Sequence, residues 1–172
     1  MKTPVLNTPT NLALIASAGS FALLLGAFAF QHIGGLAPCK LCLWQRWPHA
    51  AAVLIGILIL TLGSRVRAGA VAVALTFLGA LAAGTSAVIG AYHTGVEYGW
   101  WKGPSTCTSS NPADMSADAF FDKVMNAPLI RCDEVAWSLA GLSMASWNAV
   151  LSIILVGIWL RAAKQFSRFP QG

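Results

Sequence analysis

Apolar residues dominate four stretches of this chain, and each stretch is about as long as a membrane-spanning helix. The stretches cover residues 12–33, 43–62, 71–92 and 144–160. A bilayer core of about 30 Å needs roughly 20 apolar residues in a helix. None of the four stretches contains an acidic residue or alternates as a strand would. We therefore predict four transmembrane helices, and the second is extended if it begins near Cys39.

Small residues recur within these stretches, and in the third they are Gly79, Ala83, Gly84 and Ala87. In lipid, small residues let helix backbones approach closely. A chain of 172 residues has room for one domain. The expected fold is therefore all-α: one four-helix membrane bundle over residues 1–172, with outer loops at about 34–42 and 93–143.

The long outer loop contains one further helical pattern. Phe120, Phe121 and Val124 have helical spacing between Met115 and Met125. This pattern predicts a short amphipathic helix lying on the membrane surface.

Composition agrees with a membrane protein, because 56% of the residues are hydrophobic and only 10% are charged. A soluble domain typically has about 25% charged residues. The first stretch contains Ala27-Phe28-Ala29, which resembles the small-residue cleavage site of a signal peptide. Its apolar run is too long for a typical signal peptide, so we expect it to remain as a span.

The distribution of charge predicts the orientation. The net charge is +5, and all six acids lie within residues 97–134. Basic residues are instead spread over the termini and short loops, as membrane topology signals are, and we expect no binding to nucleic acid. The bases that an even number of spans puts on one side are Lys2, Arg65, Arg67, Arg161, Lys164 and Arg168. Lys and Arg enrichment marks the cytoplasm, so both termini are expected there and the cysteines on the opposite side.

The four cysteines fall in the two outer loops. Cys39 and Cys42 lie in the short loop, and Cys107 and Cys132 lie in the long one. Four cysteines allow three pairings, and two inert disulfides that brace the loops are one interpretation. The Cys39–Cys42 pair favours another, because a disulfide across two residues closes a very small ring and stabilises poorly. Redox chemistry is the commoner use of such a pair.

Two features of the sequence can lower a thiol pKa near this pair. Pro38 suits the first turn of a helix, which puts Cys39 near unpaired backbone N–H groups. Arg46 lies one turn after Cys42 on the same face. Pro48 leaves the local geometry open, because proline kinks or ends a helix. Zinc is the other use of such a pair, with Cys39, Cys42, His49 and a loop cysteine as candidate ligands.

Arg46 stands at the edge of an apolar span, where a charge needs a partner. Simple snorkelling to the headgroups is one interpretation. Beside a redox pair, Arg46 is also a candidate to bind a polar acceptor at the membrane surface. A quinone fits, because its carbonyls accept hydrogen bonds while its isoprenoid tail stays in lipid. The negative charge that develops on reduction would be stabilised by the arginine.

The segment Cys39-Lys40-Leu41-Cys42-Leu43-Trp44-Gln45-Arg46 resembles the C-x-L-C-x-x-Q-R signature of the DsbB family of disulfide bond formation proteins. The resemblance continues through most of the chain. Further matching segments are Phe30-Gln31-His32, Tyr92-His93-Thr94, Gly103 to Cys107, Cys132-Asp133-Glu134 and Gly141 to Met144.

The resemblance implies a four-helix enzyme of the bacterial inner membrane that reoxidises a periplasmic thioredoxin-like dithiol protein, DsbA, with ubiquinone or menaquinone as acceptor. It implies that Cys107 and Cys132 form the disulfide that the partner attacks, with Cys107 carrying the mixed disulfide. Cys39 would exchange with Cys132, freeing Cys42 for the quinone. The positions matching the family's quinone site are Arg46, His93 and Glu97.

Two other functions are weighed against this one. A structural or adaptor protein with loop-bracing disulfides would have unreactive Cys39 and Cys42 and would bind no quinone. A thiol oxidoreductase of the vitamin K epoxide reductase type would have its membrane-proximal CxxC pair after the loop cysteines. Here Cys39 and Cys42 come first, an order that favours the DsbB resemblance.

Overall fold

The computed structural model describes residues 8–62, 69–104 and 131–168. It contains four long helices: α1 (Pro9–His32), α2 (Lys40–Leu62), α3 (Ala70–Glu97) and α5 (Met144–Phe166). Each helix is long and apolar enough to cross a membrane, which confirms the predicted four-helix membrane fold. The amphipathic helix expected between Met115 and Met125 lies outside the described residues.

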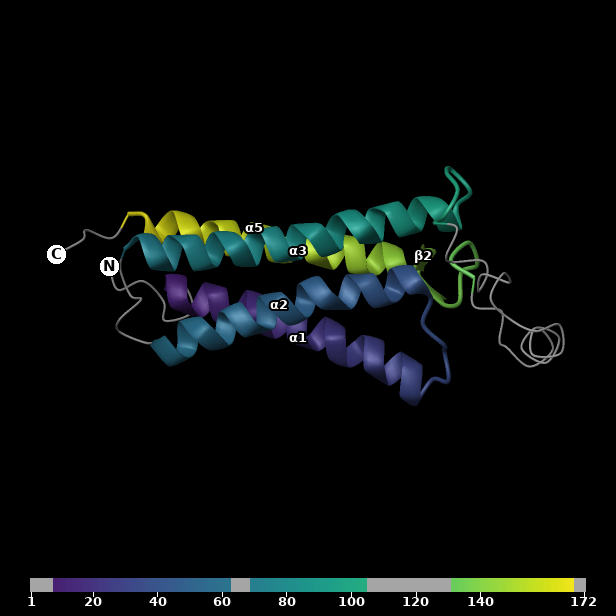
Figure 1. The fold of residues 1–172 in the computed structure, drawn as a ribbon, viewed down its shortest axis with the longest axis horizontal. Helices are drawn as coiled ribbons and strands as arrows, with labels where there is room; N and C mark the ends of the chain where they lie inside the picture. The colour runs from purple at the N-terminus through teal and green to yellow at the C-terminus, as the bar shows by residue number, and fades with distance from the viewer. Residues whose placement is uncertain (1–7, 63–68, 105–130, 169–172) are drawn as a thin grey trace, which may run out of the picture.

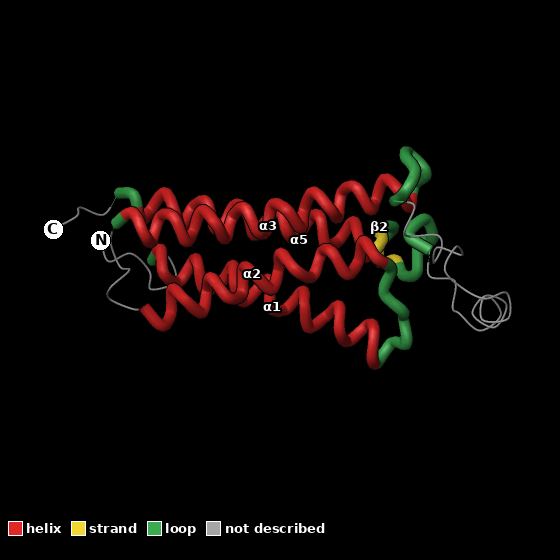
Figure 2. The backbone as a smooth tube through the Cα atoms, in the orientation of Figure 1, coloured by secondary structure: helices red, strands yellow, loops and turns green. Residues whose placement is uncertain are grey.

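The four helices form a bundle in which α1 and α3 each pack against α2 and α5 (Figure 1). The start of α1 and the end of α5 lie at one end of the bundle, and the α1–α2 connection lies at the other (Figure 2). We call this second end the cysteine end, because Cys39, Cys42 and Cys132 pack together there. Towards the cysteine end, α1 diverges from the other helices (Figures 1 and 2).

The outer faces of the helices carry large apolar side chains that are exposed in the isolated chain. Phe77, Leu81 and Ile153 are each at least half exposed. The bundle interior instead contains mostly small and polar residues. A surface of this kind is stable in lipid and not in water, in agreement with a membrane-spanning bundle.

Polar side chains cap two of the helices. The Thr8 hydroxyl accepts a hydrogen bond from the backbone N–H of Asn11 at 3.3 Å, and Pro9 follows as the first residue of α1. The Ser143 hydroxyl accepts from the N–H of Ser146 at 3.1 Å at the start of α5. Each cap satisfies a backbone donor that has no partner within its helix.

Two helices extend beyond the apolar stretches that predict them. α3 continues to Glu97, so that His93 and Glu97 lie in its last turns. α2 begins at Lys40 and runs through Pro48 without a break. The apolar pattern marks only the part of a helix that lies in the hydrocarbon core, and polar residues continue these helices beyond it.

A short β-hairpin that the sequence did not predict precedes α5. Strands β1 (Ser138–Leu139) and β2 (Leu142–Ser143) pair antiparallel. Ala140 and Gly141 between them have φ values of 51° and 78°, as a tight two-residue turn requires. The Trp147 indole N–H donates to the Leu139 carbonyl at 3.0 Å. The hairpin thereby closes over the start of α5 at the cysteine end.

The opposite half of the bundle has an apolar core in which Trp159 is fully buried. Gly79 of α3 faces the Trp159 ring, and a Cβ atom at Gly79 would lie only 2.6 Å from it. The small residues in the third stretch therefore allow close packing, as the sequence predicts. The other members of this core are Leu12, Ala13, Ala16, Ile59, Ala80, Ala83, Leu155 and Ala162.

Candidate active site

Cys39 and Cys42 lie at the beginning of α2. Cys39 directly precedes the helix, and its sulfur accepts the backbone N–H of Cys42 at 3.2 Å, in the manner of a cap. The sulfur atoms of Cys39 and Cys42 lie 3.0 Å apart, and neither cysteine is in a disulfide. Pro38 precedes the helix rather than lying in its first turn as predicted, because Cys39 occupies the capping position. Cys39 is nevertheless at the helix start, where the helix dipole favours a thiolate.

His93 and Glu97 of α3 approach the pair from one side. The Nε2 atom of His93 lies 3.5 Å from the Cys39 sulfur and 3.9 Å from Oε1 of Glu97. The Ser143 hydroxyl donates a hydrogen bond to the Glu97 carboxylate. The backbone of Cys132 also contacts the His93 ring through a hydrogen bond. Two residues that the resemblance assigns to the quinone site thus lie beside Cys39.

These surroundings favour the thiolate of Cys39. The hydrogen bond from the Cys42 thiol lowers the pKa of Cys39 from 9.0 to about 4, against the opposing effect of burial. His93 lowers this pKa further through its hydrogen bond to the sulfur. Cys39 is therefore ionised at neutral pH when the pair is reduced. A thiolate is the reactive form in disulfide exchange.

Cys132 joins this cluster from the segment that follows the long loop. It is almost fully buried and packs with Cys39, Leu41, Val96 and Cys42. Cys132 is disulfide-bonded, and Cys107 lies outside the described residues. Three of the four predicted redox cysteines are therefore in one buried cluster.

Arg46 lies one helical turn beyond Cys42, turned towards α1. It donates to the Gln31 side-chain oxygen at 2.5 Å and to the Ala27 carbonyl at 3.4 Å. Its guanidinium carbon lies 4.9 Å from the ring centre of Phe28. Its buried Nε atom has no hydrogen-bond partner among the described residues. Arg46 is thus held by polar contacts within the bundle while one donor is left for another group.

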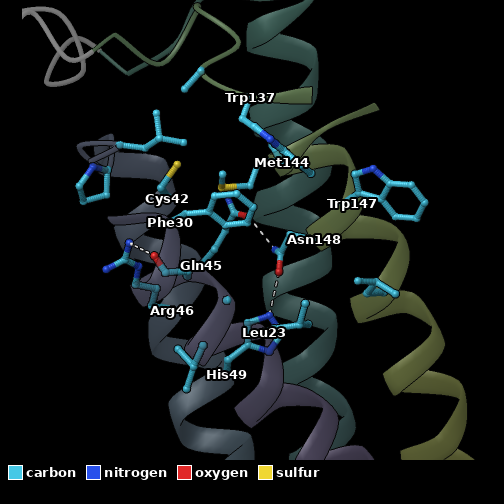
Figure 3. A pocket seen from close by; sticks show the side chains of 18 of the residues that line it. Leu23, Phe30, Cys42, Gln45, Arg46, His49, Trp137, Met144, Trp147 and Asn148 are labelled. Carbon is cyan, nitrogen blue, oxygen red and sulfur yellow. Dashed lines mark hydrogen bonds between the residues drawn. The ribbon is translucent and has the colours of Figure 1, made fainter. Parts of the chain in front are cut away.

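Cys42 and Arg46 line one cavity of about 400 Å³ between α1, α2, α5 and the hairpin segment (Figure 3). Phe30, Trp137 and Met144 supply apolar walls, as Figure 3 shows. His93 and Glu97 do not line this cavity, and His93 instead lies beside Cys39. The structure therefore separates the predicted quinone residues. Arg46 lines the cavity, whereas His93 and Glu97 lie beside the cysteine pair.

A buried polar network, which the sequence analysis missed, crosses the bundle beneath the cysteines. Asn148 of α5 donates to the Gln45 side-chain oxygen at 2.6 Å, and its own oxygen lies 2.9 Å from Nε2 of His49 (Figure 3). Ser86 and Ser152 contact His49 at 2.9 and 3.4 Å. The signal was present as two pairs four residues apart within apolar spans, Gln45 with His49 and Asn148 with Ser152. Polar residues in spans usually face the bundle interior.

The zinc site considered from the sequence includes His49, and the structure does not place His49 beside the cysteines. His49 bonds to Asn148 in the polar network, whereas His93 lies beside the cysteines. Among the described residues, Cys39, Cys42 and His93 are the one group of three such side chains whose candidate ligand atoms lie within 4.8 Å of one another. The same three groups suit thiol exchange, in which an imidazole N–H stabilises a thiolate.

Comparisons with known proteins point in one direction. The family model "Disulfide bond formation protein DsbB" matches residues 9–162. A disulfide bond formation protein B from Verminephrobacter eiseniae is 29% identical, covering 91% of this chain and 89% of the relative. Disulfide bond formation protein B 2 of Pseudomonas aeruginosa is 30% identical, covering 87% of both chains. No solved structure gave a significant match.

Proposed function

Because this chain belongs to the DsbB family of disulfide bond formation proteins, we propose that it reoxidises a DsbA-type dithiol protein and passes the electrons to a membrane quinone, ubiquinone or menaquinone. The family and the four apolar helices make it a multi-pass membrane protein of disulfide bond formation. The acceptor, the partner and the roles of individual residues are what we propose.

One arrangement carries the proposal. Cys42 lines the cavity beside Arg46, while Cys39, only 3.0 Å away, packs with Cys132. Electrons that reach Cys132 can therefore pass through the Cys39–Cys42 pair to a group in the cavity by exchange between sulfur atoms in contact. Two disulfides that only brace loops would not require this cavity or a buried arginine beside it.

The cavity suits the head group of a quinone. Its volume of about 400 Å³ lies within the range of about 300–1,000 Å³ typical of ligand pockets. Its walls are mostly apolar, and Arg46 supplies an unpartnered buried donor. Such a donor stabilises the negative charge that forms on a carbonyl oxygen during reduction. A quinone bound there would supply the two-electron acceptor.

The thiol exchanges follow in an order that balances electrons. A thiolate of the partner attacks the Cys107–Cys132 disulfide, bonds to Cys107 and releases Cys132. Cys132 attacks Cys39 in the oxidised Cys39–Cys42 pair and releases Cys42 as a thiolate at the cavity wall. The partner's second thiolate then closes its own disulfide and releases Cys107. Cys107 attacks Cys132 in the Cys39–Cys132 disulfide and releases Cys39, which restores the Cys107–Cys132 disulfide. The reduced Cys39–Cys42 pair then carries the partner's two electrons, and a quinone in the cavity would accept them through Cys42.

The low pKa of Cys39 helps this sequence. A sulfur whose pKa is about 4 is a good leaving group, which favours the step in which Cys107 attacks Cys132 and releases Cys39. A stabilised thiolate also favours the reduced pair, which makes the Cys39–Cys42 disulfide a stronger oxidant. Both effects suit an enzyme that must accept electrons from DsbA, itself a strong oxidant.

We infer the orientation from charge. Exposed Arg161 and Lys164 lie near the end of α5, at the end of the bundle opposite the cysteines. Since basic residues favour the cytoplasmic side, the cysteine end faces the periplasm of a bacterial inner membrane. That compartment is oxidising, as disulfide formation requires.

Quinone reduction by the purified full-length protein in detergent tests the proposal. A reduced DsbA-type protein would supply electrons, and absorbance would report loss of the quinone. We expect quinone-dependent turnover in the wild-type protein and none in Cys42→Ser. Absence of turnover in intact, quinone-loaded protein with several DsbA-type partners would contradict the proposal and favour a structural role for the disulfides.

A further inference from the structure

We propose that Gln45 and Asn148 are positioning residues that hold His93 in the tautomer whose Nε2–H donates to the sulfur of Cys39. The hydrogen bonds form a chain of donors that runs from α5 through α2 and α3 to the reactive cysteine. The role of this chain in catalysis rests on the proposed function, but its direction follows from the contacts alone.

The orientation of Gln45 is fixed by a group that can only accept. Its Nε2 atom donates to the backbone carbonyl of Leu41 at 3.2 Å. Because a carbonyl has no hydrogen to give, this end of the Gln45 side chain must be the NH₂ group. The same nitrogen lies 3.1 Å from Nδ1 of His93. Nδ1 of His93 must therefore accept, and in a neutral imidazole the proton is then on Nε2.

The opposite face of the His93 ring agrees with this assignment. Nε2 lies 3.5 Å from the Cys39 sulfur and 3.9 Å from Oε1 of Glu97. Both neighbours become anions when ionised, and an unprotonated Nε2 would present a lone pair to each of them. A proton on Nε2 instead gives the thiolate a donor. The titratable groups facing Cys39 are thus Cys42 on α2 and His93 and Glu97 on α3.

Asn148 fixes the other end of Gln45. Its NH₂ group donates to Oε1 of Gln45 at 2.6 Å and to the Ser86 hydroxyl at 3.1 Å. Its own oxygen faces Nε2 of His49 at 2.9 Å. All links therefore point the same way: His49 donates to Asn148, Asn148 to Gln45, Gln45 to His93 and His93 to Cys39. Reversing Gln45 would break the contacts at both of its ends.

The consequence is that Asn148, three hydrogen bonds away from Cys39, influences its reactivity. If the Gln45 amide loses its fixed orientation, Nδ1 of His93 can take the proton. Nε2 then becomes an acceptor and withdraws the donor from the Cys39 thiolate. A hydrogen bond to a charged group is strong. At pH values below the titration midpoint of Cys39, losing this bond should therefore reduce the thiolate fraction about tenfold.

Nitrogen NMR of the reduced full-length protein, labelled with ¹⁵N-histidine in detergent, tests the tautomer directly. Long-range ¹H–¹⁵N correlations distinguish a protonated ring nitrogen from a bare one. His32→Gln and His49→Gln identify the signals of His93 by elimination. We expect His93 to have a protonated Nε2 and a bare Nδ1. A protonated Nδ1, alone or together with Nε2, would overturn the proposal without any variant of the chain.

Variants then test the positioning role. In Gln45→Leu and Asn148→Leu we expect a mixed His93 tautomer, and the pH midpoint of Cys39 alkylation should rise by about one unit. Ser152→Ala is the matched control, because it removes a buried polar group of α5 that, like Asn148, contacts His49 but has no link towards Cys39 among the described residues. An unchanged tautomer and alkylation profile in both leucine variants would overturn the role of these residues.

Neither readout uses quinone or a DsbA-type protein. This matters because Gln45 and Asn148 also line the cavity, so a loss of turnover alone would not separate positioning from acceptor binding. If the tautomer is as proposed and turnover is absent, the proposed function fails and this inference stands. If turnover is present and Nδ1 is protonated, this inference fails and the proposed function stands.

Discussion

The two halves of the bundle are built on different principles. In the half away from the cysteines, small residues bring the helices together around Trp159, and the core is apolar. At the cysteine end, α1 diverges, a cavity opens, and polar groups such as Gln45 and Asn148 connect the remaining helices. Close packing thus joins the helices in one half, whereas the other half places a cavity and a polar network beside the cysteines.

The largest effect that distinguishes the halves is the titration of Cys39. In the reduced protein, alkylation by iodoacetamide should have its midpoint near pH 4, whereas an ordinary thiol titrates near pH 9.0. The reason is the hydrogen bond from Cys42 together with His93. Mass spectrometry of the alkylated protein across pH would locate the modified sulfur. A midpoint near pH 8 or 9 would contradict the lowered pKa of Cys39 and with it this difference between the two halves.

The same pKa shift makes a prediction for stability. The pKa of Cys39 is lower in the folded, reduced protein than in the unfolded chain, so the thiolate stabilises the folded state. This contribution is complete above pH 9.0, declines as the pH falls and is gone below about pH 4. Unfolding of the reduced protein at several pH values, with Cys39→Ala as control, would measure it.

The next effect concerns the cavity. Arg46→Ala should raise the apparent KM for quinone about 10- to 100-fold, because a hydrogen bond from a charged donor contributes about 1.5–3 kcal/mol. Exchange of Cys107 with a dithiol should remain, because it does not involve the cavity. Steady-state quinone reduction and trapping of the mixed disulfide would measure the two steps.

Arg161→Ala is the matched control for Arg46. It removes an arginine that is exposed in the opposite half of the bundle. If both variants have the same KM, Arg46 has no special role and serves only to anchor α2 at the membrane surface.

In the apolar half, the expected effect is on stability instead of activity. A Cβ atom at Gly79 would lie 2.6 Å from the Trp159 ring, whereas one at Gly84 on the same helix would meet only Val156, at 3.8 Å. Gly79→Ala should therefore lower the free energy of unfolding by about 1–3 kcal/mol through overpacking. Gly84→Ala should be neutral or stabilise by up to about 1 kcal/mol. Unfolding in detergent micelles would compare them, and equal stabilities would show that α3 and α5 do not pack closely at Gly79.

The sequence predicted the architecture well, because lipid imposes a length and an apolar composition that can be read from one chain. It also predicted that α2 begins near Cys39 and that small residues pack the helices. It did not predict the hairpin, because Ala140 is not a residue that usually marks a left-handed turn. The sequence placed Pro38 in the first turn of α2, whereas the helix begins at Lys40 because Cys39 occupies the capping position.

The contacts of the candidate site were harder to predict. The sequence identified His93 from a resemblance, but only the structure places it beside Cys39 and not in the cavity. The sequence makes His49 a candidate metal ligand, because a single sequence does not show which way a helix faces. Nothing in the sequence connects Asn148 with its partner Gln45, which is 103 residues away in the chain. Such long-range polar pairs depend on how the helices are rotated in the bundle.

The smallest effect compares two buried serines, one in each half. The Ser20 hydroxyl, in α1, has no hydrogen-bond partner among the described residues, whereas the Ser86 hydroxyl donates to the Gln45 carbonyl and accepts from Asn148. Ser20→Ala removes an unsatisfied group and should leave stability unchanged or raise it by up to about 1 kcal/mol. Ser86→Ala removes these two bonds and the 2.9 Å contact with His49. It should lower stability by about 0.6 kcal/mol or somewhat more, as loss of polar contacts between membrane helices does. The opposite signs matter more than the sizes, because the same substitution is made at two fully buried sites. If Ser20→Ala also destabilises the protein, the apolar half contains a polar contact of its own, and the division of the bundle into a packing half and a chemical half is too sharp.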